Sequence, residues 1–266
     1  MLDKVKYINH KNETILFGED GIVINKNDLR DYSWNYNSQY SKITSFSRST
    51  TKKKIPYVIY GSRSEANRIF EIFEKDVLAG IAGKLYIGDY YIRGYIFAST
   101  KTDYLGDVIK GTLQFVTDSN TWIKSVTYLY RLNDVKNQEG LGYEYDFPYD
   151  YTSKVNTQDM NNTSFVESDF ILNVYGQVND PVVTIAGHDY HVEVDLASNE
   201  YLTINSHDKT IIKTDGRGNK INVFANRDLD SYIFQKLPTG ESKIVTSSDF
   251  NFDITLLMER SEPEWT

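Results

Sequence analysis

The most regular stretch of the chain reads Ser62-Arg-Ser-Glu-Ala-Asn-Arg-Ile-Phe-Glu-Ile-Phe-Glu-Lys-Asp-Val-Leu78. Ser62 and Glu65 have the spacing of a capping box, and glycines at 80 and 83 favour an end to a helix. Apolar residues at three- and four-residue steps form one stripe, Ala66, Ile69, Phe70, Phe73 and Val77. We therefore predict one helix over about residues 62–78, lying with this stripe on a β-sheet.

Strand-forming segments surround the predicted helix. Lys84–Ile87 and Tyr90–Phe97 are rich in β-prone residues and flank a Gly-Asp turn, which predicts a hairpin. Val108–Val116 predicts a further strand of the same unit, and Lys4–Asn9 with Thr14–Phe17 predicts an N-terminal hairpin. The first unit is thus expected to be a sheet covered by one helix.

Aromatic residues also stand in a polar region, residues 22–40, which we expect to be irregular. Trp34, Tyr36 and Tyr40 lie there among Asn, Asp and Ser residues. Exposed rings in a polar loop indicate a contact surface, and the alternative is that they fold back over the core as a lid. We take these three residues as candidate contact residues.

Lys42–Phe46 and Ile55–Tyr60 predict two strands on either side of a basic, hydroxyl-rich segment, residues 48–54. We interpret this segment as the solvated tip of a hairpin. The alternative is a surface that attracts an acidic partner, because surface charge steers association.

The second half of the chain carries short strand patterns and no helix signal. The predicted strands are spaced as in a β-sandwich: Phe165–Tyr175, Val182–Ile185, Tyr190–Leu196, Tyr201–Asn205, Thr210–Thr214, Lys220–Phe224, Ile233–Lys236, Lys243–Val245 and Phe252–Glu259. We expect no further helix in this half.

Between the halves, residues 143–151 read Tyr-Glu-Tyr-Asp-Phe-Pro-Tyr-Asp-Tyr. Pro148 lacks a backbone donor, so the stretch favours an extended connector over a helix, and an exposed tyrosine-rich loop is the alternative. The predicted organisation is a first domain over residues 1–130, a connector over 131–164 and a second domain over 165–266.

Composition limits the class of protein. The chain has 266 residues, a net charge of −8 and a pI of about 5.1, which allows two domains and argues against a dedicated nucleic-acid-binding surface. The 21 Tyr and 13 Phe against 3 Met favour β-structure. Cysteine is absent, which excludes disulfides and thiolate chemistry. We recognise no secretory signal and no membrane span, and we expect a soluble protein made in the cytoplasm.

The sequence offers little chemistry for catalysis. His188 and His191 are spaced so that a strand would put their rings on opposite faces, which disfavours a zinc site, whereas a turn between them could bring the rings together. The glycines within residues 215–219 supply turn geometry, and no nucleophile elbow, phosphate loop or dinucleotide fingerprint is present. We predict no catalytic residue, no cofactor and no metal site.

Nine segments, taken in order along the chain, carry a resemblance to a known family. They are residues 62–76, 83–94, 115–122, 145–151, 175–181, 201–204, 231–234, 238–240 and 259–265. No single segment is specific, and the resemblance lies in their order. In this order they resemble the distal tail protein (Dit) of siphophages and prophages of Gram-positive bacteria.

The resemblance implies a belt domain that forms a hexameric ring, alone or stacked in pairs, followed by a galectin-like β-sandwich. It implies a structural, non-enzymatic component of the virion, at the tail tip or baseplate. The implied partners are further copies of the chain, the tail-tube protein, the tail-associated hub protein and receptor-binding or baseplate proteins. DNA is implied only in passage through the lumen, which an acidic wall suits. Trp34, Tyr36 and Tyr40 become candidates for ring contacts.

Two other classes of protein stay open. A carbohydrate-binding module involved in host adsorption would need an aromatic ring with convergent polar groups on one concave face, and Trp265 is poorly placed to be that ring. A cell-wall hydrolase would need a catalytic constellation, and none can be named. We rank the structural ring first and the carbohydrate-binding module second.

Overall fold

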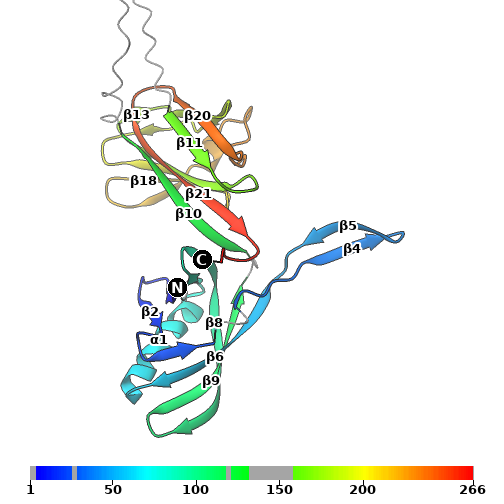
Figure 1. Ribbon diagram of the computed structural model, residues 1–266. Helices are drawn as coiled ribbons and strands as arrows, with labels where there is room; N and C mark the ends of the chain where they lie inside the picture. Colours follow the sequence, from blue (N-terminus) through cyan, green and yellow to red (C-terminus); the bar gives the residue numbers. More distant parts are fainter. Residues whose placement is uncertain (1–3, 26–28, 118–120, 132–157, 266) are drawn as a thin grey trace, which may run out of the picture. The chain divides into compact units, whose positions relative to one another are not determined.

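The computed structural model describes residues 4–25, 29–117, 121–131 and 158–265, and shows a chain built mainly of antiparallel strands (Figure 1). The motif at residues 143–151 and most of the predicted connector lie outside the described residues. The chain divides into two compact units. Unit 1 comprises residues 1–124 and 259–266, and unit 2 comprises residues 125–258. The predicted domain boundaries stay a prediction.

Unit 1 contains the single α-helix of the described chain. Its elements are β1 (Val5–Ile8), β2 (Thr14–Phe17), β3 (Ile22–Ile24), β4 (Asn35–Gln39), β5 (Lys42–Ser47), β6 (Thr51–Tyr60), α1 (Arg63–Ala79), β7 (Gly83–Ile87), β8 (Tyr90–Leu105), β9 (Val108–Thr117) and the start of β10 (Trp122–Tyr130). The predicted fold class, mainly β with one N-terminal helix, is confirmed for the part of the chain that the structure describes.

The strands of unit 1 form two antiparallel layers that share β8. Its first residues pair with β7, which continues through β1 to β2, and its later residues pair with β9, which continues through β6 to β3. The predicted N-terminal hairpin and the hairpin at Gly88 are therefore confirmed. Helix α1 closes the core between the layers, where Phe73 meets Tyr7 of β1 and Phe70 meets Tyr57 of β6 edge to face.

Helix α1 begins and ends as its sequence predicts. Ser62 and Glu65 form both bonds of the capping box, and Gly80 closes the helix in the left-handed conformation that glycine adopts without strain. The predicted apolar stripe is rotated. Ile72 and Asp76 are buried with Ala66, Ile69 and Phe73, whereas Phe70 is half-buried and Val77 is 43% exposed.

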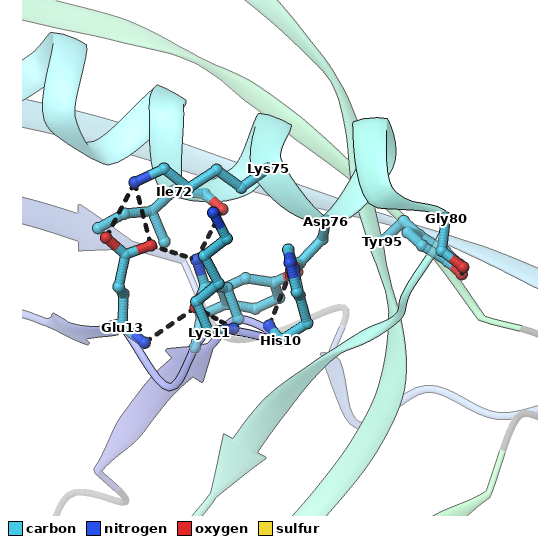
Figure 2. A network of polar contacts seen from close by, with 10 residues as sticks. His10, Lys11, Glu13, Ile72, Lys75, Asp76, Gly80 and Tyr95 are labelled. Carbon is cyan, nitrogen blue, oxygen red and sulfur yellow. Dashed lines mark hydrogen bonds and ion pairs between the residues drawn. The ribbon is translucent and has the colours of Figure 1, made fainter. Parts of the chain in front are cut away.

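A polar network fixes the other flank of α1 to the N-terminal hairpin (Figure 2). The buried Asp76 carboxylate accepts hydrogen bonds from the Tyr7 hydroxyl at 2.6 Å and the His10 backbone amide at 2.8 Å. Lys75 Nζ donates a hydrogen bond to Glu13 Oε1 at 2.9 Å. This bond holds the pKa of Glu13 below its ordinary value. Gly83 lies so close to the Asp76 carboxylate that a Cβ at position 83 would collide with it.

Unit 2 is a two-layer β-sandwich. Its strands are β11 (Gln158–Asn162), β12 (Asp169–Tyr175), β13 (Val178–Asn179), β14 (Val182–Ile185), β15 (His188–His191), β16 (Asp195–Leu196), β17 (Tyr201–Asn205), β18 (Thr210–Thr214), β19 (Lys220–Asn222), β20 (Gly240–Thr246) and most of β21 (Asn251–Arg260). One layer runs β19–β18–β17–β12–β21 and the other β11–β20–β14–β15. Apolar residues of both layers share one core.

A buried carboxylate ties three segments of unit 2 together. Asp169 opens β12 and accepts hydrogen bonds at 2.8 Å from Ser206 Oγ and from Lys236 Nζ. Burial alone would raise the pKa of Asp169, but hydrogen bonds from His207, Lys236 and Ser206 outweigh it and hold that pKa well below the ordinary value. The carboxylate is therefore charged at neutral pH and anchors the layer.

One local prediction is wrong. The expected hairpin of residues 42–46 and 55–60 does not form, because β6 begins at Thr51 and pairs with β3 and β9. Lys53, placed by the sequence at a solvated tip, is buried with its Nζ 2.5 Å from the Asp31 carbonyl oxygen. The true partner of β5 is β4, within the stretch expected to be irregular.

Candidate assembly surface

Strands β4 and β5 form a hairpin, residues 35–47, which we call the arm. They pair with one another as a separate two-stranded sheet, and the arm extends away from the remainder of unit 1 (Figure 1, blue). Every residue of both strands is exposed. A lone two-stranded hairpin is only marginally stable in water, so the arm has the character of a surface that gains stability from a partner.

The two faces of the arm differ in chemistry. Tyr36 lies opposite Phe46, and Ser38, two residues along, lies opposite Ile43 across a bulge. Because opposed residues share a face, Tyr36, Phe46 and Ile43 form one apolar face, with exposed fractions of 64%, 61% and 58%. The other face is polar, with Asn37 Nδ2 donating to Ser45 Oγ at 3.1 Å.

The base of the arm is held by Arg48. Its guanidinium lies 4.3 Å from the centre of the Trp34 ring and donates to Thr121 Oγ1. It also approaches the C-terminal segment, with Glu259 Oε2 at 3.8 Å and Ser261 Oγ at 3.4 Å. These contacts fix the two ends of the arm relative to unit 1.

Arg30 makes a second set of contacts with the same C-terminal segment. Its guanidinium stacks 4.0 Å from the centre of the Trp265 ring, and its Nη1 donates to the Pro263 carbonyl oxygen at 2.7 Å. Glu262 Oε1 lies 3.9 Å from Arg30 Nη1. Cation–π contacts of this kind are favourable even when partly exposed. Residues 259–265 thus complete unit 1 beside the base of the arm.

The three predicted contact residues lie along this one segment. Trp34 stands at the base under Arg48, Tyr36 on the apolar face, and Tyr40 at the turn with 91% of its surface exposed. Sequence reasoning missed Ile43 and Phe46 as members of the same surface. Regular alternation along β5 would put these two residues on opposite faces, and only the bulge in the pairing with β4 shows that they share one.

Unit 2 carries a concave surface, a hollow of about 670 Å³ lined by residues 224, 227–234 and Lys209. Arg227 lies 4.2 Å from the centre of the Phe224 ring, and Tyr232 lines the hollow with an exposed ring. Asp228 lies 3.7 Å from His191. Burial lowers the pKa of His191, but its contacts with Asp180 and Asp228 outweigh this and raise that pKa.

His188 and His191 do not converge. His188 Nε2 lies 3.0 Å from the Tyr232 carbonyl oxygen, whereas His191 Nε2 lies 2.9 Å from Asp180 Oδ1. The two rings therefore engage different segments, as the strand geometry of β15 predicts.

Charge is divided unevenly between the units. Unit 1 holds 19 Lys and Arg against 17 Asp and Glu, a net charge of +2, and unit 2 holds 10 against 20, a net charge of −10. The acidic excess of the chain, −8 in all, therefore belongs to unit 2. Among the described residues, no helix is both long and apolar enough to cross a membrane.

Comparison with known proteins gives a match of fold. No family model and no curated protein matches the sequence. Among solved structures, the chain is similar to the SPP1 Dit protein (gp 19.1), described as a paradigm of the hub adsorption apparatus in phages that infect Gram-positive bacteria. That match has 9% identity and a TM-score of 0.56 over 98% of this chain and 100% of the SPP1 protein.

Chains of the phage P2 baseplate in its activated conformation are similar as well. The chain from the structure with Ca matches at 14% identity and a TM-score of 0.65, covering 99% of this chain and 100% of the other. The chain from the structure with Sr matches at 14% identity and a TM-score of 0.63, covering 96% and 98%. The resemblance to Dit seen in the sequence is thus confirmed as a shared fold over nearly the whole chain.

Proposed function

We propose that this protein is a structural, non-enzymatic component of a phage tail tip or baseplate. The observation that carries the proposal is the end-to-end likeness of fold to the SPP1 Dit hub protein and to P2 baseplate chains. The exposed apolar face of the arm supports it, because such a face is a liability unless an assembly covers it. Its place is the distal end of the tail in the virion, after synthesis in the host cytoplasm.

In this proposal, unit 1 forms a hexameric ring, alone or as a stacked pair, between the tail-tube protein and the tail-associated hub protein. Trp34, Tyr36 and Tyr40 take part in the contacts around the ring. The galectin-like sandwich of unit 2 carries receptor-binding or baseplate proteins. DNA passes through the lumen, and a nearly neutral unit 1 would not hold the phosphate backbone as a basic wall would.

The solution mass tests the ring. Light scattering over a concentration series is expected to show species of six or twelve chains of 30.7 kDa, with rings in negative-stain images. A variant carrying Tyr36→Ser and Phe46→Ser should weaken association by about tenfold or more, because the apolar face is lost. Asn37→Ala, on the polar face, is the matched control. A strict monomer at all concentrations, also with the tail-tube protein present, would contradict the ring.

The hollow of unit 2 favours one alternative function, carbohydrate binding during host adsorption. It combines the exposed Tyr232 ring with Asp228, Arg227 and Lys209 on one concave face. In that case a glycan array should show micromolar binding that falls about tenfold or more in Tyr232→Ala, because the stacking ring is lost. Tyr60→Ala, an exposed tyrosine of unit 1, should leave binding unchanged. An array without any bound glycan would exclude this function.

A further inference from the structure

The apolar face of the arm and a groove elsewhere in unit 1 are both uncovered. The groove, about 350 Å³, runs between α1 and β8. Phe73 and Leu113 lie buried at its floor, and Val77 and Phe97 stand exposed along its sides. Glu74 and Lys101 supply a polar rim. An apolar floor with charged residues at the edge is the composition of a protein contact site.

The groove is held in shape from behind. On the opposite flank of α1, Asp76 and Lys75 bind the N-terminal hairpin through Tyr7, His10 and Glu13 (Figure 2). At the end of the helix the Tyr95 hydroxyl donates to the Gly80 carbonyl oxygen at 3.0 Å. A helix fixed along one flank presents its other flank without a cost of ordering, and such preorganisation favours binding.

The arm matches the groove in chemistry. Its apolar face offers two aromatic rings, Tyr36 and Phe46, with Ile43 beside them. Lys42 is the only charged residue within residues 35–47, and it alternates with Ile43 onto the polar face, so the apolar face carries no charge that would be buried in the groove. Both surfaces are exposed in the single chain, so neither covers the other within one molecule, and a second copy of the chain can cover both.

We propose that the arm of one copy lies with its apolar face in the α1–β8 groove of the next copy. The two surfaces differ, so the contact is head-to-tail, and repetition of such a contact gives a ring when the rotation between neighbours closes, as the proposed hexamer requires. The inference rests on the proposed ring and specifies which surfaces form it. Covering both surfaces removes the exposed apolar area from water, which supplies the driving force.

Cross-linking tests the contact directly, because the natural chain has no cysteine. Phe46→Cys combined with Val77→Cys should give, under mild oxidation, disulfide-linked dimers and higher species up to the ring size, which disappear on reduction. Phe46→Cys combined with Lys6→Cys is the matched control, since Lys6 points to the sheet face opposite α1. Each single-cysteine variant is tested as well, because a disulfide-linked dimer of it would show that the residue meets its own counterpart in another copy. The buried Trp122 verifies folding by its fluorescence.

A second readout uses neighbouring helix residues. Val77→Glu should lower the association constant by about tenfold or more, whereas Leu78→Glu should change it by less than about twofold. Both side chains are exposed, but only Val77 lines the groove. Rings that form without cross-links between positions 46 and 77, and with equal effects of the two Glu variants, would overturn this contact and leave the proposed function standing. Absence of any ring would overturn both.

Discussion

Replacing Asp76 with alanine is expected to lower the free energy of unfolding of unit 1 by about 3–5 kcal/mol. The carboxylate is 0% exposed and accepts hydrogen bonds from the Tyr7 hydroxyl and from both the backbone amide and the ring of His10. Alanine would leave these groups without their acceptor and open a cavity under α1. Since a domain has a total stability of about 5–15 kcal/mol, the change removes a large share of it.

The distribution of tryptophan makes this effect measurable. All 3 tryptophans, Trp34, Trp122 and Trp265, belong to unit 1, so tryptophan fluorescence follows its unfolding separately from unit 2. In a urea titration Asp76→Ala should shift the fluorescence midpoint to lower urea, and Asn67→Ala, on the exposed side of the same helix, should leave it in place. An unchanged midpoint for Asp76→Ala would show that the network contributes little.

Replacing Asp169 with asparagine is expected to lower the free energy of unfolding of unit 2 by about 2–3 kcal/mol at neutral pH. The buried carboxylate accepts hydrogen bonds from Ser206 Oγ and from Lys236 Nζ, each at 2.8 Å. Ser206 Oγ in turn accepts a hydrogen bond from the Phe170 backbone amide. An amide cannot neutralise the lysine, and one of its two polar atoms is a donor facing donors. The expected loss in free energy of unfolding is smaller than for Asp76→Ala because Lys236 is partly exposed.

The effect should depend on pH in a defined direction. The pKa of Asp169 in the folded protein lies below its ordinary value of 3.8. The stabilisation that the charged carboxylate gives to unit 2 is therefore fully present at pH values above 3.8. It is lost progressively as the pH falls below about 4 toward the folded pKa. The difference between the natural protein and Asp169→Asn should therefore shrink on acidification.

Circular dichroism combined with fluorescence would check this second prediction. The variant should move the transition seen by circular dichroism but not by tryptophan fluorescence, since unit 2 has no tryptophan. Asp195→Asn, an exposed change of the same charge in the same unit, serves as control. A difference that stays constant from pH 7 to about pH 3 would contradict the assigned role of the carboxylate.

Local signals in the sequence predicted the elements that local chemistry determines. The capping box at Ser62 and the glycine at position 80 place the ends of α1 within about one residue, because both act within a single turn. The apolar stripe was misplaced because Asp76 is polar in sequence yet buried in the fold. Its burial depends on Tyr7 and His10, more than 60 residues away along the chain.

The arm could not be found in the same way. Asn35–Gln39 is polar apart from one tyrosine, so nothing in its composition favours a strand, and pairing with β5 determines its conformation. Tyr36 was selected as a contact residue for its type alone, and its partners Ile43 and Phe46 needed the register. The overall acidity was also read as a property of the whole chain, whereas the structure assigns it to unit 2.

Residues 259–265 have a consequence for the order of events during synthesis. They belong to unit 1, yet the ribosome makes them only after every residue of unit 2. Arg30 and Arg48, synthesised more than 200 positions earlier, must wait for them. A growing chain therefore has time to form the core of unit 1 but not the finished base of the arm. In the proposed assembly, a chain would therefore present a finished arm base to its neighbours only after both units have been made.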